Sequence, residues 1–292
     1  IGHPYECRDP KVWRENGRYF MCIASSYKKE EGVLLIYTSD DGENWTYLNR
    51  LQDKQFGTVL ECPDVFCIDG QHILIASPIG VLKDTDYPGN QSTMQKLSFD
   101  AEDGSMALES EAQFLDYGMD LYAPQSCIDE AGRRCVIAWV RMPIPQSPDD
   151  NEAADGRPWS GMMSLPRVVT LRGGEIYTSV HPNVREYFAE NSCEESTEKY
   201  TRWTKDGRSR TVLTLREGQS VELAGVMIEL NGGCVCTDRT KRVPQGVDVH
   251  VKCCTPRVGD VCELEVYEEK NLIEIFVNDG QYVISNVLYP CR

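Results

Sequence analysis

The 292-residue sequence has little that would hold nucleic acid or enter a membrane. Thirty Lys and Arg stand against 46 Asp and Glu, so the formal net charge is −16. Phosphate backbones and anionic membrane surfaces bind clusters of Lys and Arg, so we expect neither as a partner. No apolar run approaches the ~18 residues of a membrane helix. The longest runs, Val33–Tyr37 and Val136–Val140, have the length of strands.

Metal ligands at recognisable spacing are also scarce, because only four histidines occur. Cys234-x-Cys236 and Cys253-Cys254 have no partner at the spacing of a zinc finger. We therefore expect no metal site and no cofactor.

Cysteine itself is abundant, with 13 residues, but the spacings do not resemble a disulfide framework. Cys22, Cys67 and Cys135 lie inside apolar, strand-like runs, where a free thiol behaves as a small hydrophobe. The composition predicts structural thiols and a reducing cytoplasm. The chain begins at Ile1 without a signal-peptide pattern, so its true N-terminus is unseen and an extracellular location stays open.

Helical periodicity is nearly absent from the first half, which instead contains a repeat. Arg8-Asp9-Pro10 recurs in pattern as Glu61-Cys62-Pro63 at an offset of 53 residues, and more loosely as Tyr122-Ala123-Pro124. A turn glycine and an apolar run follow each motif: Gly17 and Tyr19–Ala24, Gly70 and Ile73–Ala76, Gly132 and Val136–Trp139. Each copy therefore predicts a strand, a turn and a second strand.

Short antiparallel strands recurring at this period are typical of β-propeller blades. The first copy continues into Val33–Thr38, the turn Asp40-Asp41-Gly42 and a fourth strand at Trp45–Leu48. We predict about three blades in residues 1–180, too few to close a ring of ~4–8 blades. An ordinary β-sandwich with chance Pro and Gly matches is the alternative.

The remainder predicts a second domain. Residues 181–195 indicate a short helix and an acidic linker, and residues 196–292 predict a C-terminal β-sandwich. Its strands are expected at Val212–Leu215, Ser220–Leu223, Val226–Leu230, Val247–Val251, Cys262–Tyr267, Ile273–Val277 and Tyr282–Ser285. Good turn sequences, such as Asn278-Asp279-Gly280, separate them.

The repeat also predicts a site, because the innermost strands of propeller blades surround one axis. Arg8 with Asp9, Glu61 with Cys62, and the stretch Asp120–Tyr122 occupy equivalent places in successive copies. Single charged residues at strand ends are often only solvated, but three equivalent copies favour a shared pocket.

Paired carboxylates are the usual means of cleaving a glycosidic bond. Arg8 beside Asp9 would keep that carboxylate ionised, which suits it to hold hydroxyls or stabilise positive charge. Glu61 has no adjacent base in the sequence, an environment that could raise the pKa of its carboxyl. Glu61 is therefore the better candidate for the general acid.

Five segments together resemble glycoside hydrolase family 32, which includes invertases, sucrose-6-phosphate hydrolases, inulinases and levanases. They are Glu6-Cys-Arg-Asp-Pro10, Glu61-Cys-Pro63, Leu115-Asp-Tyr-Gly-Met-Asp-Leu-Tyr-Ala-Pro-Gln125, Trp159-Ser-Gly-Met-Met-Ser-Leu-Pro-Arg167 and Ile273-Glu-Ile-Phe-Val-Asn-Asp-Gly280. The resemblance covers essentially the whole chain. It implies an all-β fold, a partial five-bladed β-propeller followed by a β-sandwich.

The resemblance also implies roles for residues. Asp9 would stabilise the transition state, and Glu61 would be the general acid and then the base that activates water. Substrate-binding roles fall to Arg8, Cys62, Asp120, Tyr122 and Trp159. For Trp159, a core aromatic is an equally good interpretation.

One departure from the family pattern concerns the nucleophile, an Asp in an Asn-Asp-Pro-Asn-type segment that no part of this chain contains. The resemblance therefore implies a C-terminal portion of the family that lacks the first blades. We expect the complete enzyme to release β-D-fructofuranosyl groups from sucrose, sucrose 6-phosphate or a fructan with retention. The chain alone is expected to be inactive or severely impaired, and to self-associate or need a further N-terminal segment.

Two alternatives stay open. The chain could be a non-catalytic, fructan-binding remnant of such an enzyme. It could also be a five-bladed relative acting on another furanoside, such as an arabinofuranosidase, although Glu61-Cys62-Pro63 favours fructosides.

Overall fold

The computed structural model describes residues 6–81, 90–145, 158–190 and 192–289. The chain forms two compact units, one from residues 1–115 and 122–126, the other from residues 116–121 and 127–292. Almost all described elements are strands in antiparallel sheets, so the predicted all-β class is confirmed. Among the described residues, no helix has the length and apolarity required to cross a bilayer.

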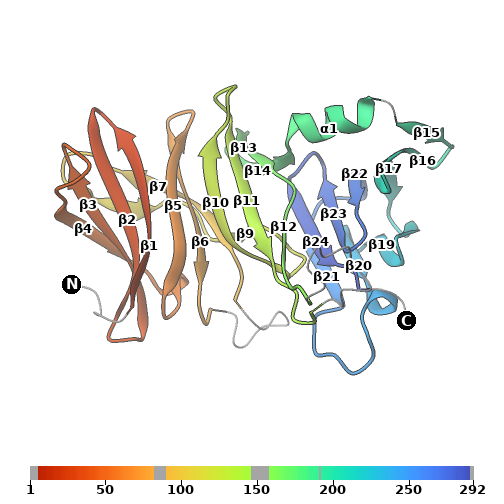
Figure 1. Ribbon diagram of the computed structural model, residues 1–292, viewed down its shortest axis with the longest axis horizontal. Helices are drawn as coiled ribbons and strands as arrows, with labels where there is room; N and C mark the ends of the chain where they lie inside the picture. Colours follow the sequence, from red (N-terminus) through yellow and green to blue (C-terminus); the bar gives the residue numbers. More distant parts are fainter. Residues whose placement is uncertain (1–5, 82–89, 146–157, 191, 290–292) are drawn as a thin grey trace. The chain divides into compact units, whose positions relative to one another are not determined.

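The first unit contains two antiparallel sheets, drawn from red to yellow in Figure 1. One has the order β1 (Cys7–Glu15), β2 (Arg18–Tyr27), β3 (Glu31–Ser39), β4 (Thr46–Gln52). The other has the order β5 (Leu60–Ile68), β6 (Gln71–Pro78), β7 (Thr93–Phe99), β8 (Met106–Leu108), and β9 (Gln113–Phe114) also pairs with β7. Within each sheet, apart from β9, each strand pairs with the next strand in the sequence, as the repeat predicts.

The turns between the first strands of each sheet depend on glycine. Gly17 and Gly70 each have φ +82°, a left-handed conformation that residues with a Cβ rarely adopt. Alternation then sends apolar side chains to one face, where Phe20, Leu34 and Leu74 are fully buried. Burial of this cluster positions the strand starts that carry Asp9 and Glu61.

The second unit contains three groups of strands. The first sheet has the order β10 (Leu121–Ile128), β11 (Arg134–Val140), β13 (Arg167–Arg172), β14 (Glu175–Val180). Strand β12 (Met162–Met163) also pairs with β11. The residues of β10 are divided between the two units. Helix α1 (Pro182–Ala189) follows, with His181 as its N-cap.

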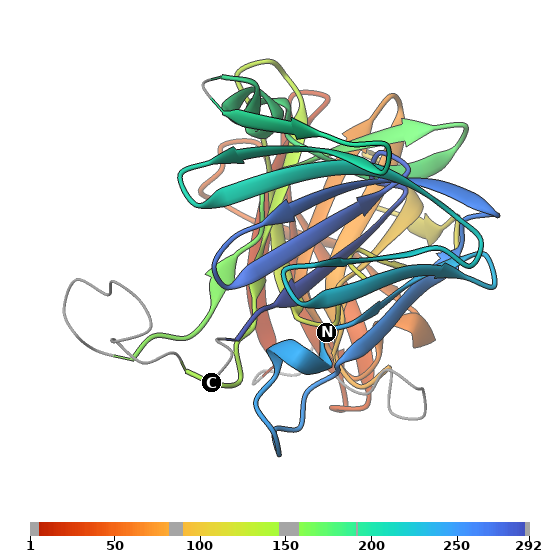
Figure 2. The same ribbon diagram turned by 90° about the vertical axis from the view of Figure 1, so that its right-hand side faces the viewer.

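The strands after α1 form two further antiparallel sheets, coloured from teal to blue in Figure 2. Six strands have the order β15 (Cys193–Ser196), β16 (Tyr200–Lys205), β17 (Arg208–Arg216), β22 (Val261–Glu268), β23 (Leu272–Val277), β24 (Tyr282–Val287). Four have the order β18 (Ser220–Leu223), β19 (Val226–Asn231), β20 (Cys234–Asp238), β21 (Lys252–Arg257).

The strand predictions for this region hold in six places and fail in one. Val247–Val251 is not a strand, although three valines alternate in it; the strand β21 begins one residue later, at Lys252. Instead, the Val251 carbonyl accepts a hydrogen bond from the backbone of Arg239. The strands β15, β16, β20 and β21 were not predicted, because their sequences lack clear apolar alternation.

A disulfide is a second departure from prediction. Cys236 on β20 and Cys254 on β21 are directly opposed in register and form a disulfide bond. They lie 18 positions apart in the sequence, and the pairing of β20 with β21 brings the two sulfur atoms together. Ten other described cysteines are free.

Candidate active site

The repeat places a residue in the left-handed conformation near the start of each of the strands β1, β5 and β10. Asp9, Cys62 and Ala123 have φ of +56°, +50° and +51°, although none is glycine. The ladder register shifts at the first two of these positions. A proline follows each residue, and proline, which cannot donate a ladder hydrogen bond, is tolerated at such bulges. Non-glycine residues held in this region cost on the order of 1–3 kcal/mol and cluster at functional sites.

The Glu61 carboxyl is held on both of its oxygens. Arg8 donates from Nε and Nη2 to Oε1 at 3.1 and 3.0 Å. The Tyr122 hydroxyl donates to Oε2 at 2.6 Å. The three residues come from β1, β5 and β10, so equivalent places in the three repeat copies do meet.

The Asp9 carboxyl lies beside the same motif. Its Oδ2 accepts a hydrogen bond from the backbone N–H of Cys62 at 2.9 Å, and Cys62 directly follows Glu61. The Asp9 side chain is therefore anchored by the backbone of the second repeat copy, where the bulge turns an N–H away from the strand ladder. Two carboxyl groups, one guanidinium and one phenol thus form a single cluster in the first unit.

This cluster remains open to solvent. The Arg8 and Glu61 side chains keep 33% and 23% of their surface exposed. Asp9 and Cys62 are also partly exposed. A ligand can therefore reach these groups, unlike a fully buried ion pair.

The prediction that Arg8 serves Asp9 is wrong. Its guanidinium bonds to Glu61 and, through Nη1, to Glu6. Hydrogen bonding to Glu6, opposed by partial burial and aided by Glu61, raises the pKa of Arg8 above its usual value. Glu61 therefore does have a basic partner in the folded protein. The residues next to Glu61 in the sequence do not reveal it, because Arg8 lies 53 positions away.

Cys62 is a neutral thiol in this setting. Burial first, and then the charges of Asp9 and Glu61, raise the pKa of its thiol to about 12. A thiol is a poor nucleophile compared with a thiolate. Cys62 holds the Asp9 carboxylate through its backbone N–H, and its raised pKa makes the thiol a poor attacking group.

A second set of contacts, which the sequence analysis missed, ties the three strand starts together. The Lys11 ammonium lies 2.9 Å from Asp64 Oδ2 and donates to the Ser126 carbonyl at 2.6 Å. The Ser126 N–H donates to the same Asp64 oxygen at 2.7 Å. Lys11 and Asp64 each lie two positions after a residue in the left-handed conformation, so they are equivalent in the repeat. The alignment of the repeat copies could therefore have predicted that they meet.

Asp120 and Trp159 belong to the second unit. The Asp120 carboxylate is buried, bound by the Arg239 guanidinium on both oxygens and by the backbone N–H of Val287. Burial raises the pKa of Asp120, and Arg239 opposes that shift. Trp159 packs against a hydrophobic cluster that includes Val140 and Tyr289. These contacts favour structural roles for both residues over direct contact with a sugar.

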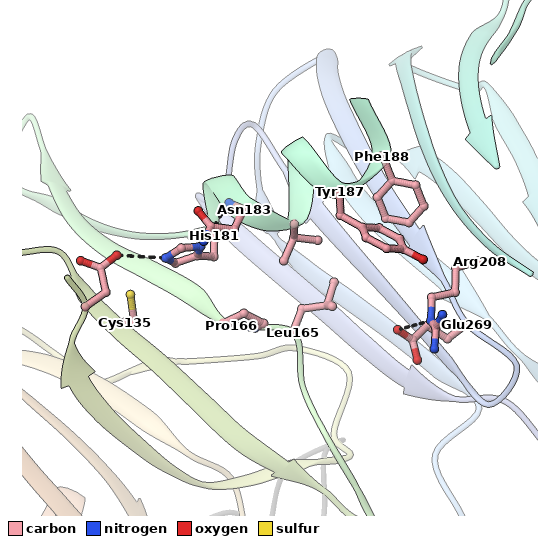
Figure 3. Close-up of a pocket in the computed structure, with 11 residues that line it drawn as sticks. Cys135, Leu165, Pro166, His181, Asn183, Tyr187, Phe188, Arg208 and Glu269 are labelled. Carbon is pink, nitrogen blue, oxygen red and sulfur yellow. Dashed lines mark hydrogen bonds and ion pairs between the residues drawn. The ribbon is translucent and has the colours of Figure 1, made fainter. Parts of the chain in front are cut away.

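A cavity of about 540 Å³ in the second unit contains the one group of described residues whose donor atoms could meet at a metal ion (Figure 3). The group is Asp129, Cys135 and His181, with ligand atoms within 4.8 Å of one another. His181 Nδ1 accepts the Asn183 N–H that caps α1, so the ring proton is on Nε2 and is donated to Asp129 at 3.0 Å. Coordination through Nε2 would require the ring proton on Nδ1, which could then no longer accept the Asn183 N–H. His181 is therefore better explained as the cap of α1.

Solved structures of known proteins share the fold of this chain. A sucrose-6-phosphate hydrolase structure from Lactobacillus gasseri superposes with a TM-score of 0.80 at 22% identity, covering 97% of this chain and 61% of that one. A mutant family 32 β-fructofuranosidase from Bombyx mori, solved in complex with sucrose, gives 0.68 at 23% identity, covering 97% and 61%. At these identities the likeness shows the fold: the chain is an all-β protein of the kind found in family 32 structures.

The sequence comparisons decide the family. Residues 2–180 match the profile described as "Glycosyl hydrolases family 32 N-terminal domain", and the chain belongs to glycosyl hydrolase family 32. The sucrose-6-phosphate hydrolase of Vibrio alginolyticus is 29% identical over 298 residues, which are 96% of this chain and 58% of that protein. That of Bacillus subtilis is 27% identical over 317 residues, 99% of this chain and 63% of that protein.

These matches correct one prediction. The chain is not merely a C-terminal portion of the family, because the matched profile is that of the N-terminal domain. The chain nevertheless spans only about three-fifths of the length of these two relatives, 58% and 63%.

Proposed function

We propose that this chain carries the acid–base half of a β-fructosidase active site, which cleaves terminal β-D-fructofuranosyl bonds with retention. The observation that carries the proposal is the cluster of Asp9, Glu61, Arg8 and Tyr122, which three repeat copies assemble in a family 32 chain. Sucrose 6-phosphate and sucrose are the proposed substrates, because relatives bear the name sucrose-6-phosphate hydrolase and one relative was solved with sucrose. A fructan is the third candidate.

In this proposal Glu61 protonates the glycosidic oxygen and later accepts a proton from water. Arg8 and Tyr122 orient its carboxyl group, since each holds a different oxygen. Asp9 accepts hydrogen bonds from sugar hydroxyls with its second oxygen, because Oδ2 is occupied by the Cys62 N–H. The general-acid contribution is on the order of 10²–10⁴-fold in rate.

The covalent step needs a carboxylate nucleophile about 5–5.5 Å from the acid. No Asn-Asp-Pro-Asn segment occurs in the 292 residues. We propose that residues outside this sequence supply that group, in keeping with the greater length of the relatives. Asp120 is a poor substitute, because Arg239 and Val287 hold both of its oxygens in a buried site.

The same proposal extends to architecture and location. The sheets β1–β4 and β5–β8 have the strand order of propeller blades, and we assign residues 1–180 to about three of five blades. Residues 181–195 form the link, and residues 196–292, with their six- and four-stranded sheets, a β-sandwich. Ten free cysteines among the described residues favour the cytoplasm, although the Cys236–Cys254 bond does not.

Fructose release from sucrose, sucrose 6-phosphate and inulin tests the proposal. The 292-residue chain should release no measurable fructose, whereas the same chain preceded by a segment with an Asn-Asp-Pro-Asn motif should hydrolyse one of them. Loss of one member of a cooperating catalytic set can cost on the order of 10⁶-fold in rate. Robust turnover by the chain alone would place the nucleophile inside these residues. Failure of the extended chain to turn over, with sugar binding retained, would favour the non-catalytic remnant.

A further inference from the structure

A small basic cavity lies in the second unit, on the sheet that contains β16, β17 and β22. Its volume is about 290 Å³. Four cationic side chains line it, accompanied by two carboxylates: Arg202, Arg208, Arg242 and Lys270, with Glu268 and Glu269. A local excess of positive charge is notable in a chain whose net charge is −16.

Two of the four cations are already paired. Arg202 donates to Glu268 Oε2 at 3.1 Å. The Arg208 guanidinium lies 3.4 Å from Glu269, and Figure 3 shows this second pair. These pairs neutralise both carboxylates of the cavity. The charge that remains on its walls is that of Arg242 and Lys270.

Neither remaining cation has a side-chain partner among the residues that the structure describes. Arg242 makes hydrogen bonds only through its backbone, to the Arg239 carbonyl and from the Tyr289 N–H. Its Nε is buried without any acceptor. A buried guanidinium N–H normally donates a hydrogen bond, because an N–H that is removed from water without an acceptor costs the free energy of its desolvation.

The position of Arg242 is nevertheless fixed. It ends the 3-10 turn Thr240–Arg242, and a Cβ on Gly225 would approach its Cδ to 2.9 Å. The stem therefore packs closely on the backbone at Gly225, which restricts the conformations of a side chain that lines the cavity. A pre-positioned guanidinium loses less conformational entropy when it binds an anion.

We propose that this cavity binds a phosphate group, held by Arg242 and Lys270. A guanidinium offers paired N–H donors that match two phosphate oxygens, and a lysine ammonium adds a point charge. Thr204 and Ser209 also line the cavity and offer hydroxyl groups. The volume suits inorganic phosphate or the phosphate end of a small sugar phosphate, and excludes a large ligand. The proposal does not depend on the proposed catalytic function.

Isothermal titration of the 292-residue chain with inorganic phosphate tests the proposal, with sulfate and a neutral hexose as comparison ligands. We expect saturable phosphate binding and none with the hexose. Arg242→Gln and Lys270→Gln should each weaken it about 10- to 100-fold, the range for charge-assisted hydrogen bonds. Arg257→Gln is the matched control, because Arg257 pairs with Asp260 outside the cavity and carries the same charge.

A hexose 6-phosphate distinguishes the two sources of the phosphate group. If the hexose 6-phosphate binds tenfold more tightly than inorganic phosphate, the ligand is a phosphate ester. If the two bind equally, the cavity recognises the phosphate group alone. Either result supports the site if Arg242→Gln weakens the binding of both ligands. Thermal unfolding without ligand checks that each variant is folded, and Arg242→Lys provides a second variant that keeps the charge. Phosphate binding that is absent, or unchanged in folded Arg242→Gln and Lys270→Gln, overturns the proposal.

Discussion

The two units use the same kinds of charged residue in opposite ways. In the first, Arg8 and Glu61 keep 33% and 23% of their side chains exposed. In the second, Arg167 bonds to Asp116 at 2.7 Å and to Glu274 at 3.0 Å, and all three side chains are 1% exposed. Ser285 also bonds to this group. Solvent access, more than residue type, separates a cluster that can meet a substrate from one that can only hold the fold.

The energetic consequences also differ. Exposed or half-exposed ion pairs contribute about 0–1 kcal/mol to stability, because water screens them. Removing one partner of a buried pair leaves an unpaired charge and costs about 3–5 kcal/mol. Burial raises the pKa of Glu274, and Arg167 opposes that shift by keeping the carboxylate paired. Charge removal should therefore affect stability in the second unit and activity in the first.

The largest effect on stability is expected for Arg167→Met. This change leaves Asp116 and Glu274 buried next to one another without a cation, so the free energy of unfolding should fall by about 3–5 kcal/mol. Urea denaturation followed by circular dichroism measures it. Arg257→Met is the control, since its pair with Asp260 is 64% and 75% exposed, and should cost less than about 1 kcal/mol. Equal losses in the two variants would remove the distinction between the units.

An intermediate effect is expected from a buried thiol in the second unit. Burial raises the pKa of Cys253 to about 12, whereas an unfolded thiol titrates near 8.5. Between roughly pH 8.5 and 12 the unfolded state loses this proton while the folded state keeps it. The contribution of Cys253 to stability is therefore fully present below that range and falls as pH rises, by about 1.4 kcal/mol per pH unit.

The pH slope of the unfolding free energy, measured between pH 8 and 10, isolates this thiol when the parent is compared with Cys253→Ser. The variant should have the shallower slope whatever its absolute stability. The partly exposed Cys62, whose thiol pKa is also raised to about 12, should contribute less because water reaches it. Identical slopes in parent and Cys253→Ser would contradict the assigned pKa.

The smallest effect on stability is expected for Arg8→Met. The pair with Glu61 is partly exposed, with 33% and 23% of the two side chains open to solvent, so the free energy of unfolding should change by less than about 1 kcal/mol. In an active, extended protein the same change should lower kcat, because Glu61 Oε1 loses both of its donors. A stability loss like that of Arg167→Met would assign Arg8 a structural role instead.

Local sequence patterns were sufficient for much of the fold. Alternating apolar residues, turn glycines and the 53-residue offset between Pro10 and Pro63 predicted the strands of the first sheet and the first two strands of the second. They also predicted the meeting of Arg8, Glu61 and Tyr122. These features depend on strand periodicity and on one repeat, both of which are visible in sequence.

Pairings between distant residues could not be predicted in the same way. Asp120 follows the repeat pattern, yet its partner Arg239 lies 119 residues away and buries it. Arg8 was assigned to its neighbour Asp9, yet its guanidinium bonds to Glu61, 53 positions away in the sequence. Side-chain direction and long-range partners, rather than adjacency, decide which charges meet.

The most direct test of the central claim compares two substrates with Glu61→Gln in the extended, active protein. Cleavage of sucrose requires that its leaving oxygen be protonated. Fluoride, in contrast, departs from β-D-fructofuranosyl fluoride as an anion and needs no proton from an acid. If Glu61 is the general acid, fructose release from sucrose should fall about 10²–10⁴-fold. Fluoride release should keep a rapid burst of one equivalent, followed by slow turnover because the base for water is also lost. Equal loss of the burst and of sucrose cleavage, or near-parental cleavage of sucrose, would contradict the account.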